Sequence, residues 1–309
     1  MVCGSGFNGL VNFNSLLKML ALLIFILSST SLFLVFRSLG KGHDPLQVIL
    51  FNYLFCILFS LLSGFQDNSI HLSSIPESSW LLPALGLGLA FLLNFFLTQQ
   101  SIEKMGLGVS SVANKLSLIL PFFFTLLMNG KEPGFRAIAG LLFCIPAIFL
   151  SAGKGKSAAS GTQAAYYMLL PLAIFLGTGL TDILTQWINE NLLAPEEEAA
   201  FVLMVFSGAF LSAGFLSIYR LLKGQMVLSF HNLLPGFLLG LPNIISYKSI
   251  LAALNAFNHQ GNLVFPVANL GVIVLTGLVS VLYFKDKLSA RNLGGMGLAL
   301  LALLLLLEV

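Results

Sequence analysis

The sequence predicts an all-α integral membrane protein with ten transmembrane helices arranged as two inverted five-helix repeats. Three observations lead to this prediction: an apolar composition, apolar runs of membrane-spanning length, and similarity between the two halves. Hydrophobic residues make up 57% of the 309 residues and charged residues only 9%, against roughly 25% in a soluble domain. So few charges could not cover the surface of a soluble protein, so the chain needs a bilayer as its solvent.

Ten apolar runs, each close to the length that crosses a bilayer as a helix, are separated by charged or turn-forming residues. Helices are the expected spanning form, because each satisfies its own backbone hydrogen bonds and no barrel-like alternation is present. The spans are expected at 16–36, 45–64, 80–99, 106–128, 135–151, 166–188, 199–222, 231–254, 262–284 and 290–307. The first run is too long for a signal peptide and lacks a small-residue cleavage site, so it is expected to remain as a helix.

The second half of the sequence repeats features of the first half in the same order. The tripeptide Val-Ala-Asn occurs at 112–114 and again at 267–269, 155 positions later. Its flanks repeat too: Arg136 and Gly140 match Arg291 and Gly295, residues 81–83 and Gly88 match residues 233–235 and Gly240, and Ile24, Phe25 and Pro45 match Ile174, Phe175 and Pro195. We therefore expect two repeats, 1–151 and 165–309, joined by a flexible linker at 152–164. Because five is an odd number, the second repeat would enter the membrane inverted, as in many secondary transporters.

This five-plus-five arrangement resembles the EamA-like branch of the drug/metabolite transporter superfamily. In that pattern the fourth and ninth helices end in an acidic residue, which is followed by a Gly in the next helix. The residues that fit are Glu132 with Gly140 and Asp286 with Gly295. The chain departs from the pattern where Asp286 replaces Glu, and Thr276 stands where a partner for Pro121 would lie. The resemblance implies transport of small organic solutes without indicating which one.

The charges in the loops predict an orientation. Basic loops stay on the cytoplasmic side of a membrane. One face is expected to carry Arg37, Lys41, Lys104, Lys154, Lys156, Arg220, Lys223, Lys285, Lys287 and Arg291, and the other only Lys18, Lys131 and Arg136. We therefore expect a multi-pass protein of the inner (cytoplasmic) membrane with both termini outside.

Three ionisable residues fall inside expected spans, where charges are costly and commonly functional: Lys115, Asp182 and Lys248. Lys115 lies roughly 14 Å from the end of its helix, too deep for its side chain to reach water. With no charged partner expected at its depth, it is predicted to receive an anionic or zwitterionic group. The alternative is an ammonium satisfied by carbonyls at a helix break or neutralised by desolvation. Asp182 and Lys248 lie at similar depths and are expected to form a structural ion pair, to bind substrate or protons, or to reach the membrane interface with their side chains.

Polar residues at helical spacing flank these charges. Thr178, Thr181 and Thr185 share a helix face with Asp182, and Asn243 shares one with Tyr247. Such stripes line either a cavity or a hydrogen-bonded seam between helices, and we favour the cavity. The expected substrate-binding residues are Lys115, Asn114, Asn269, Asp182, Thr178, Thr181, Thr185, Asn243, Tyr247, Lys248 and Asn94. Gly236 and Gly240 form a small-xxx-small pair that predicts close helix packing.

These residues favour a secondary active transporter of a small organic solute working by alternating access; the alternative is a non-transporting membrane scaffold or assembly protein. Catalysis would need paired carboxylates or a nucleophile or metal cluster at one depth, but Asp182 is the only carboxylate well inside a span. No enzyme activity, metal or cofactor is therefore expected. The expected partners are a small-molecule solute, the lipid bilayer and protons as a candidate coupling ion at Asp182, exchange being the alternative. Nucleic acid is not expected, because the basic residues follow the membrane topology. The chain is expected to act as a monomer or homodimer.

Overall fold

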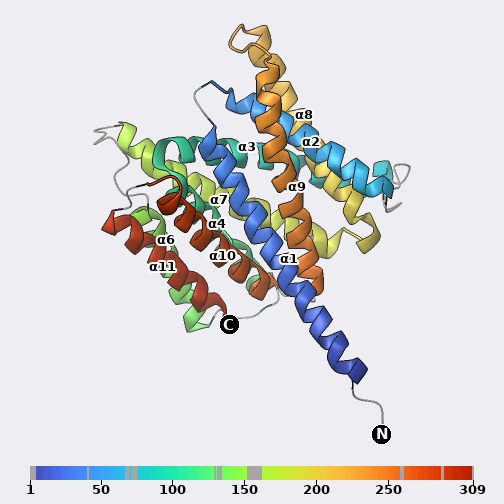
Figure 1. The fold of residues 1–309 in the computed structure, drawn as a ribbon, viewed down its shortest axis with the longest axis vertical. Coiled ribbons are helices and arrows are strands. Elements are labelled where there is room, and N and C mark those ends of the chain that lie inside the picture. The colour runs from blue at the N-terminus through green and yellow to red at the C-terminus, as the bar shows by residue number, and fades with distance from the viewer. Residues whose placement is uncertain are drawn as a thin grey trace.

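The computed structural model describes residues 5–39, 42–66, 70, 75–128, 130, 134–151, 162–257, 261–286 and 289–307. Within these ranges the regular structure is entirely helical (Figure 1). The long helices are α1 (Ser5–Ser38), α2 (Pro45–Gln66), α3 (Leu81–Met105), α4 (Leu107–Leu116), α5 (Ile119–Met128), α6 (Phe135–Ser151), α7 (Thr162–Asn191), α8 (Glu198–Leu222), α9 (Leu233–Ala256), α10 (Gly261–Leu282) and α11 (Ala290–Leu307). Three short 3-10 helices are η1 (Ile75–Glu77), η2 (Pro195–Glu197) and η3 (Phe230–Asn232).

Among the described residues, eight helical stretches are long and apolar enough to cross a bilayer, with α4 and α5 counted as one. This confirms a multi-pass membrane protein. All the expected spans are helical, but α6 and α11 are shorter apolar helices of 17 and 18 residues. The expected linker at 152–164 is helical from Thr162 onward, where α7 begins; its earlier part lies outside the described residues.

The single helix expected at 106–128 is broken in the middle. Pro121 has no N–H to donate to the Ser117 carbonyl, and its ring would clash with that carbonyl. Instead, the Leu120 amide donates to the Ser117 carbonyl at 2.9 Å, which closes a tight turn. The Ser117 hydroxyl donates to the Asn114 carbonyl at 2.6 Å. The break therefore falls after Leu116, one residue beyond Lys115, within the apolar run.

The helices pack in several close pairs. α6 lies along α11 at one edge of the molecule, α1 packs against α9 and α10, and α2 packs against α8 and α9 (Figure 1). α3 packs against α7 and α8, and α4 against α7 and α10. The predicted close contact at Gly236 and Gly240 is confirmed: a Cβ on Gly240 would lie 2.8 Å from the Asn52 carbonyl oxygen of α2. These close contacts bring polar faces of α1, α3, α4, α7, α9 and α10 around a common space.

Candidate functional site

A cavity of about 220 Å³ lies within the bundle and is lined by α1, α3, α4, α7, α9 and α10. The residues that the sequence predicted to bind substrate lie on five of these helices, α3, α4, α7, α9 and α10. An engineered protein cavity of about 150 Å³ holds benzene, so this space can hold a small organic solute. Ten of the predicted residues line it: Asn94, Asn114, Lys115, Thr178, Thr181, Asp182, Thr185, Asn243, Tyr247 and Asn269. Lys248 does not.

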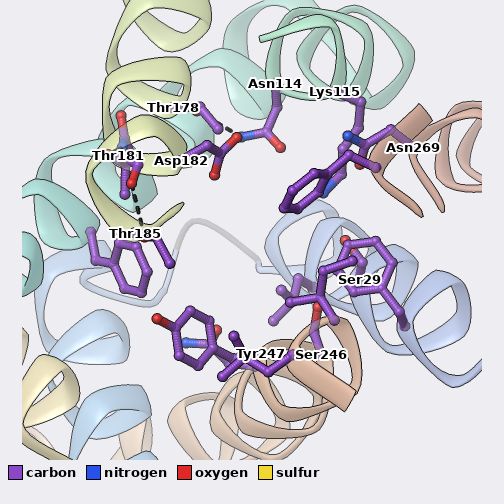
Figure 2. Close-up of a pocket in the computed structure, with 18 of the residues that line it drawn as sticks. Ser29, Asn114, Lys115, Thr178, Thr181, Asp182, Thr185, Ser246, Tyr247 and Asn269 are labelled. Atoms are coloured by element: carbon purple, nitrogen blue, oxygen red, sulfur yellow. Dashed lines mark hydrogen bonds between the residues drawn. The ribbon is translucent and has the colours of Figure 1, made fainter. Parts of the chain in front are cut away.

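The polar face of α7 is tied to its neighbours through threonine hydroxyls. Asn94 of α3 donates from Nδ2 to the Thr181 Oγ1 at 2.6 Å, and Asn114 of α4 donates to the Thr178 Oγ1 at 3.1 Å. The Thr185 hydroxyl donates to the Thr181 carbonyl at 2.8 Å (Figure 2). These hydrogen bonds fix α7 against α3 and α4, so they hold the backbone that carries Asp182 in place.

Lys115 occupies the last turn of α4 before the break. Its ammonium lies 5.3 Å from the ring centre of Phe25 and 5.8 Å from that of Phe33, both on α1. An ammonium within about 6 Å of a ring centre is attracted by the π-electrons. Among the described residues, no oxygen accepts a hydrogen bond from its Nζ. The helix does break after α4, but the Asn114 carbonyl at the break accepts a hydrogen bond from the Ser117 hydroxyl. Backbone carbonyls therefore do not satisfy the Lys115 ammonium.

Asp182 faces Lys115 from the opposite wall of the cavity (Figure 2), and the two charges interact electrostatically without forming a salt bridge. The expectation that Lys115 lacks a charged partner at its depth is therefore wrong. The expected helix end at 188 places Asp182 too close to the membrane surface, because α7 continues to Asn191. Asp182 thus lies roughly 14 Å from the end of its helix, as deep as Lys115.

The expected ion pair between Asp182 and Lys248 is also wrong. The Lys248 Nζ donates to the Ser63 Oγ of α2 at 2.5 Å. Lys248 follows Tyr247 on α9, and successive residues of a helix point about 100° apart. Because Tyr247 faces the cavity, Lys248 turns toward α2. Lys248 is therefore part of the contact between α2 and α9.

The other polar residues of the cavity differ in whether their side chains have a hydrogen-bond partner. On α9, Asn243 donates to the Asn52 Oδ1 of α2 at 3.1 Å. Asn269 on α10 is 6% exposed, and its amide has no hydrogen-bond partner among the described residues. Within the described ranges, no three His, Cys, Asp or Glu side chains gather closely enough to hold a metal ion.

The sequence missed the aromatic part of the cavity. Most of the aromatic lining comes from α1 and α3; its members are Phe25, Phe33, Phe36, Phe91, Phe95 and Phe265. The chain has 28 Phe residues, and a Phe on a cavity wall has the same apolar neighbours in sequence as a Phe facing lipid. The signal that could have found the rings of Phe25 and Phe33 is Lys115, because its buried charge needs a nearby attractive group.

An ion pair joins the ends of two cavity-lining helices on the face that carries the basic loops. The Arg37 Nη2 lies 2.8 Å from the Asp286 Oδ1, linking the end of α1 to the segment after α10. The Ser280 hydroxyl donates to the second Asp286 oxygen at 2.7 Å. Asp286 is one of the two acidic residues that support the family resemblance; the other, Glu132, lies outside the described residues.

Comparison with known proteins supports the fold and leaves the function open. No family model matches the sequence. An uncharacterised protein of Haemophilus influenzae is 27% identical over 252 residues, which cover 80% of this chain and 82% of that protein. A solved structure, described only as a crystal structure of protein, matches with a TM-score of 0.62 at 15% identity. The match covers 95% of this chain and 96% of that chain, so the fold resembles one seen by crystallography over nearly its whole length.

Proposed function

We propose that this protein is a secondary active transporter that moves a small organic solute, anionic or zwitterionic, across the cytoplasmic membrane by alternating access. The observation that carries the proposal is the cavity with two opposite, unpaired charges, Lys115 and Asp182, deep between apolar helices. Ionisable groups at such depth are costly and commonly mark the path of a solute or ion. A scaffold protein has no need of them.

The packing of the helices supports two inverted repeats, with α6 and α11 as the fifth helix of each. If each helix is exchanged for its counterpart in the other repeat, the contact between α3 and α8 corresponds to the contact between α9 and α2. In the same way, the contact between α1 and α10 corresponds to the contact between α7 and α4. All four contacts are present. Matched glycines behave alike. Gly88 of α3 lies against the α8 backbone and Gly240 of α9 against that of α2, while Gly140 lies against α11 and Gly295 against α6. Inverted repeats place the solute site near the midplane, between the halves.

Transport is proposed to draw on a gradient, either of protons that bind Asp182 or of a second solute taken in exchange. Lys115 is the charged group that faces Asp182 across the cavity. If Asp182→Asn transports solute with the pH dependence of the unmodified protein, proton coupling through Asp182 is excluded and exchange remains.

Alternating access can be tested before the solute is known. A chain with its three native cysteines replaced would carry Ser29→Cys, a nearly isosteric change on the cavity wall. Ser60→Cys on α2 is the matched control, because Ser60 is equally buried but lies outside the cavity. A membrane-impermeant maleimide should label the Ser29→Cys chain from either face of the membrane in oriented vesicles, and the Ser60→Cys chain from neither.

Labelling of the Ser29→Cys chain from a single face under all conditions, including an imposed pH gradient and a mixture of metabolites, would contradict transport and favour the scaffold alternative. The control guards against a bundle that is loosened by the missing cysteines, since such a bundle would expose the thiol of the Ser60→Cys chain as well.

A further inference from the structure

Several polar groups around the cavity lack a hydrogen-bond partner among the described residues, and they include the Lys115 ammonium, the Asp182 carboxylate, the Asn269 amide and the Tyr247 hydroxyl. Two neighbouring amides are satisfied, since Asn94 and Asn114 both donate to threonine hydroxyls of α7. Leaving polar groups unpaired between apolar helices is costly. The cavity therefore offers a cation, an anion, an amide and a phenol hydroxyl to a solute that enters it.

The two charges constrain the charge of the solute. A solute that carries only a negative charge would meet Lys115 but face Asp182 without compensation, and a solute with only a positive charge would have the reverse problem. Because the two side chains do not neutralise each other through a salt bridge, a solute with both charges can pair with each of them. Charge complementarity to both Lys115 and Asp182 therefore distinguishes a solute with two opposite charges from a solute with one.

We propose that the solute is a small zwitterion with an apolar body, of the neutral α-amino acid kind. Its carboxylate binds Lys115 and Asn269, and its ammonium binds Asp182. This inference rests on the proposed function and names the substrate class of the same site.

The surroundings of each charge fit this orientation. Lys115 and Asn269 lie on the same side of the cavity and both offer N–H donors, which suit the two oxygens of a carboxylate (Figure 2). Asp182 lies between Thr178 and Thr185 on one face of α7. The carboxylate oxygens and the two threonine hydroxyl oxygens suit the three N–H donors of an ammonium. The rings of Phe91, Phe265 and Tyr247 provide an apolar lining for the body of the solute.

The test compares solutes that share one apolar side chain and differ in the charged groups they carry. Thermal unfolding of the purified full-length chain in detergent would be followed with the neutral α-amino acids, and with matched sets such as leucine, 3-methylbutylamine and 4-methylpentanoate, or phenylalanine, phenethylamine and 3-phenylpropanoate. At least one amino acid should raise the Tm, because a ligand at a hundred times its Kd stabilises the folded state markedly. The amine and the acid of its set should bind at least tenfold more weakly.

Variants of the two charges should reverse the preference. Lys115→Ala should weaken binding of the amino acid at least tenfold while the amine now binds better than the acid; Asp182→Asn should do the opposite. Misfolding cannot produce such opposite selectivities. Lys248→Ala is the matched control, because this lysine lies outside the cavity and contacts Ser63; the amino acid should bind it unchanged. Should Lys115→Ala fail to fold, Asn269→Asp should still weaken amino-acid binding by repelling its carboxylate.

Equal binding of the acid and the amino acid would overturn the zwitterion in favour of a simple anion, and equal binding of the amine in favour of a cation. A Tm that no neutral amino acid raises would overturn the proposal as well. None of these outcomes contradicts the proposal that the protein is a transporter, because alternating access is measured separately, by cysteine labelling.

Discussion

The hydrogen bond between Asn94 and Thr181 links α3 to α7 beside the cavity. Both side chains are buried, and the Asn94 Oδ1 packs against Gly177, where no larger residue would fit. Hydrogen bonds between membrane helices contribute about 0.6 kcal/mol on average and about 1.7 kcal/mol at most. With its 2.6 Å distance, this one is expected toward the upper end of that range.

A double-mutant cycle of Asn94→Ala and Thr181→Val should therefore give a coupling free energy of about 1 kcal/mol. Unfolding in detergent provides the measurement. Asn94→Ala combined with Thr185→Val is the control and should show no coupling, because the Thr185 hydroxyl donates only within α7. Equal coupling in both cycles would mean that the Asn94–Thr181 bond is not what holds the two helices.

At the scale of single residues, the sequence predicted the cavity charges well and their partners poorly. Lys115 and Asp182 stand out because ionisable residues are rare in apolar runs. Their facing arrangement was missed because α7 runs past its expected end, which shifted the estimated depth of Asp182. The depth of Lys248 favours a place in the site, but depth does not tell which way a side chain turns around its helix.

Among the helices, the turn between α3 and α4 depends on one residue. Gly106 alone joins Met105 to Leu107, with φ 94° and ψ 169°. That region of backbone conformation is essentially restricted to glycine and costs other residues about 1–3 kcal/mol. The Ser101–Ser110 hydrogen bond of 2.7 Å crosses the turn and sets how the two helices meet.

Gly106→Ala should thus lower the free energy of unfolding by about 1–3 kcal/mol. Gly86→Ala on an exposed face of α3 is the matched control: its Cβ would meet open space and its backbone is helical, so stability should stay level or rise slightly. Unfolding of both variants in the same detergent gives the comparison. A loss in Gly86→Ala as large as in Gly106→Ala would show that any added methyl group, rather than the turn, is responsible.

The positions of the helices followed from the apolar runs, but the break of α4 and α5 did not. Proline alone does not decide where a membrane helix breaks. Pro146, Pro171, Pro242 and Pro266 all lie inside unbroken helices. At Pro121 the Ser117 hydroxyl captures the Asn114 carbonyl and the backbone closes a turn instead. Such competition between side chain and backbone depends on local packing, which a sequence pattern does not contain.

For the molecule as a whole, the two ends of the cavity differ. Toward the face opposite the basic loops, which we call the acidic face, the cavity extends to Asn189 and to Glu190, which is exposed near the end of α7. Toward the basic face, Arg37 and Asp286 join α1 to α10, with the Arg37 guanidinium above the Phe284 ring. In the proposed alternating-access cycle, this arrangement would be the state open toward the acidic face and held closed at the basic face by the ion pair.

Removing this ion pair should favour opening toward the basic face. The two side chains are 29% and 22% exposed, so their interaction stabilises the closed state by up to about 1 kcal/mol, or roughly a fivefold change in population. In the Ser29→Cys chain, Arg37→Ala or Asp286→Asn should thus raise the rate of labelling from the basic face by up to about fivefold, and high salt should do the same in the unmodified pair. The exchanged pair Arg37→Asp with Asp286→Arg should return the rate toward that of the parent. Unchanged labelling in both single variants would mean that apolar packing around Phe36, rather than the ion pair, keeps this end of the cavity shut.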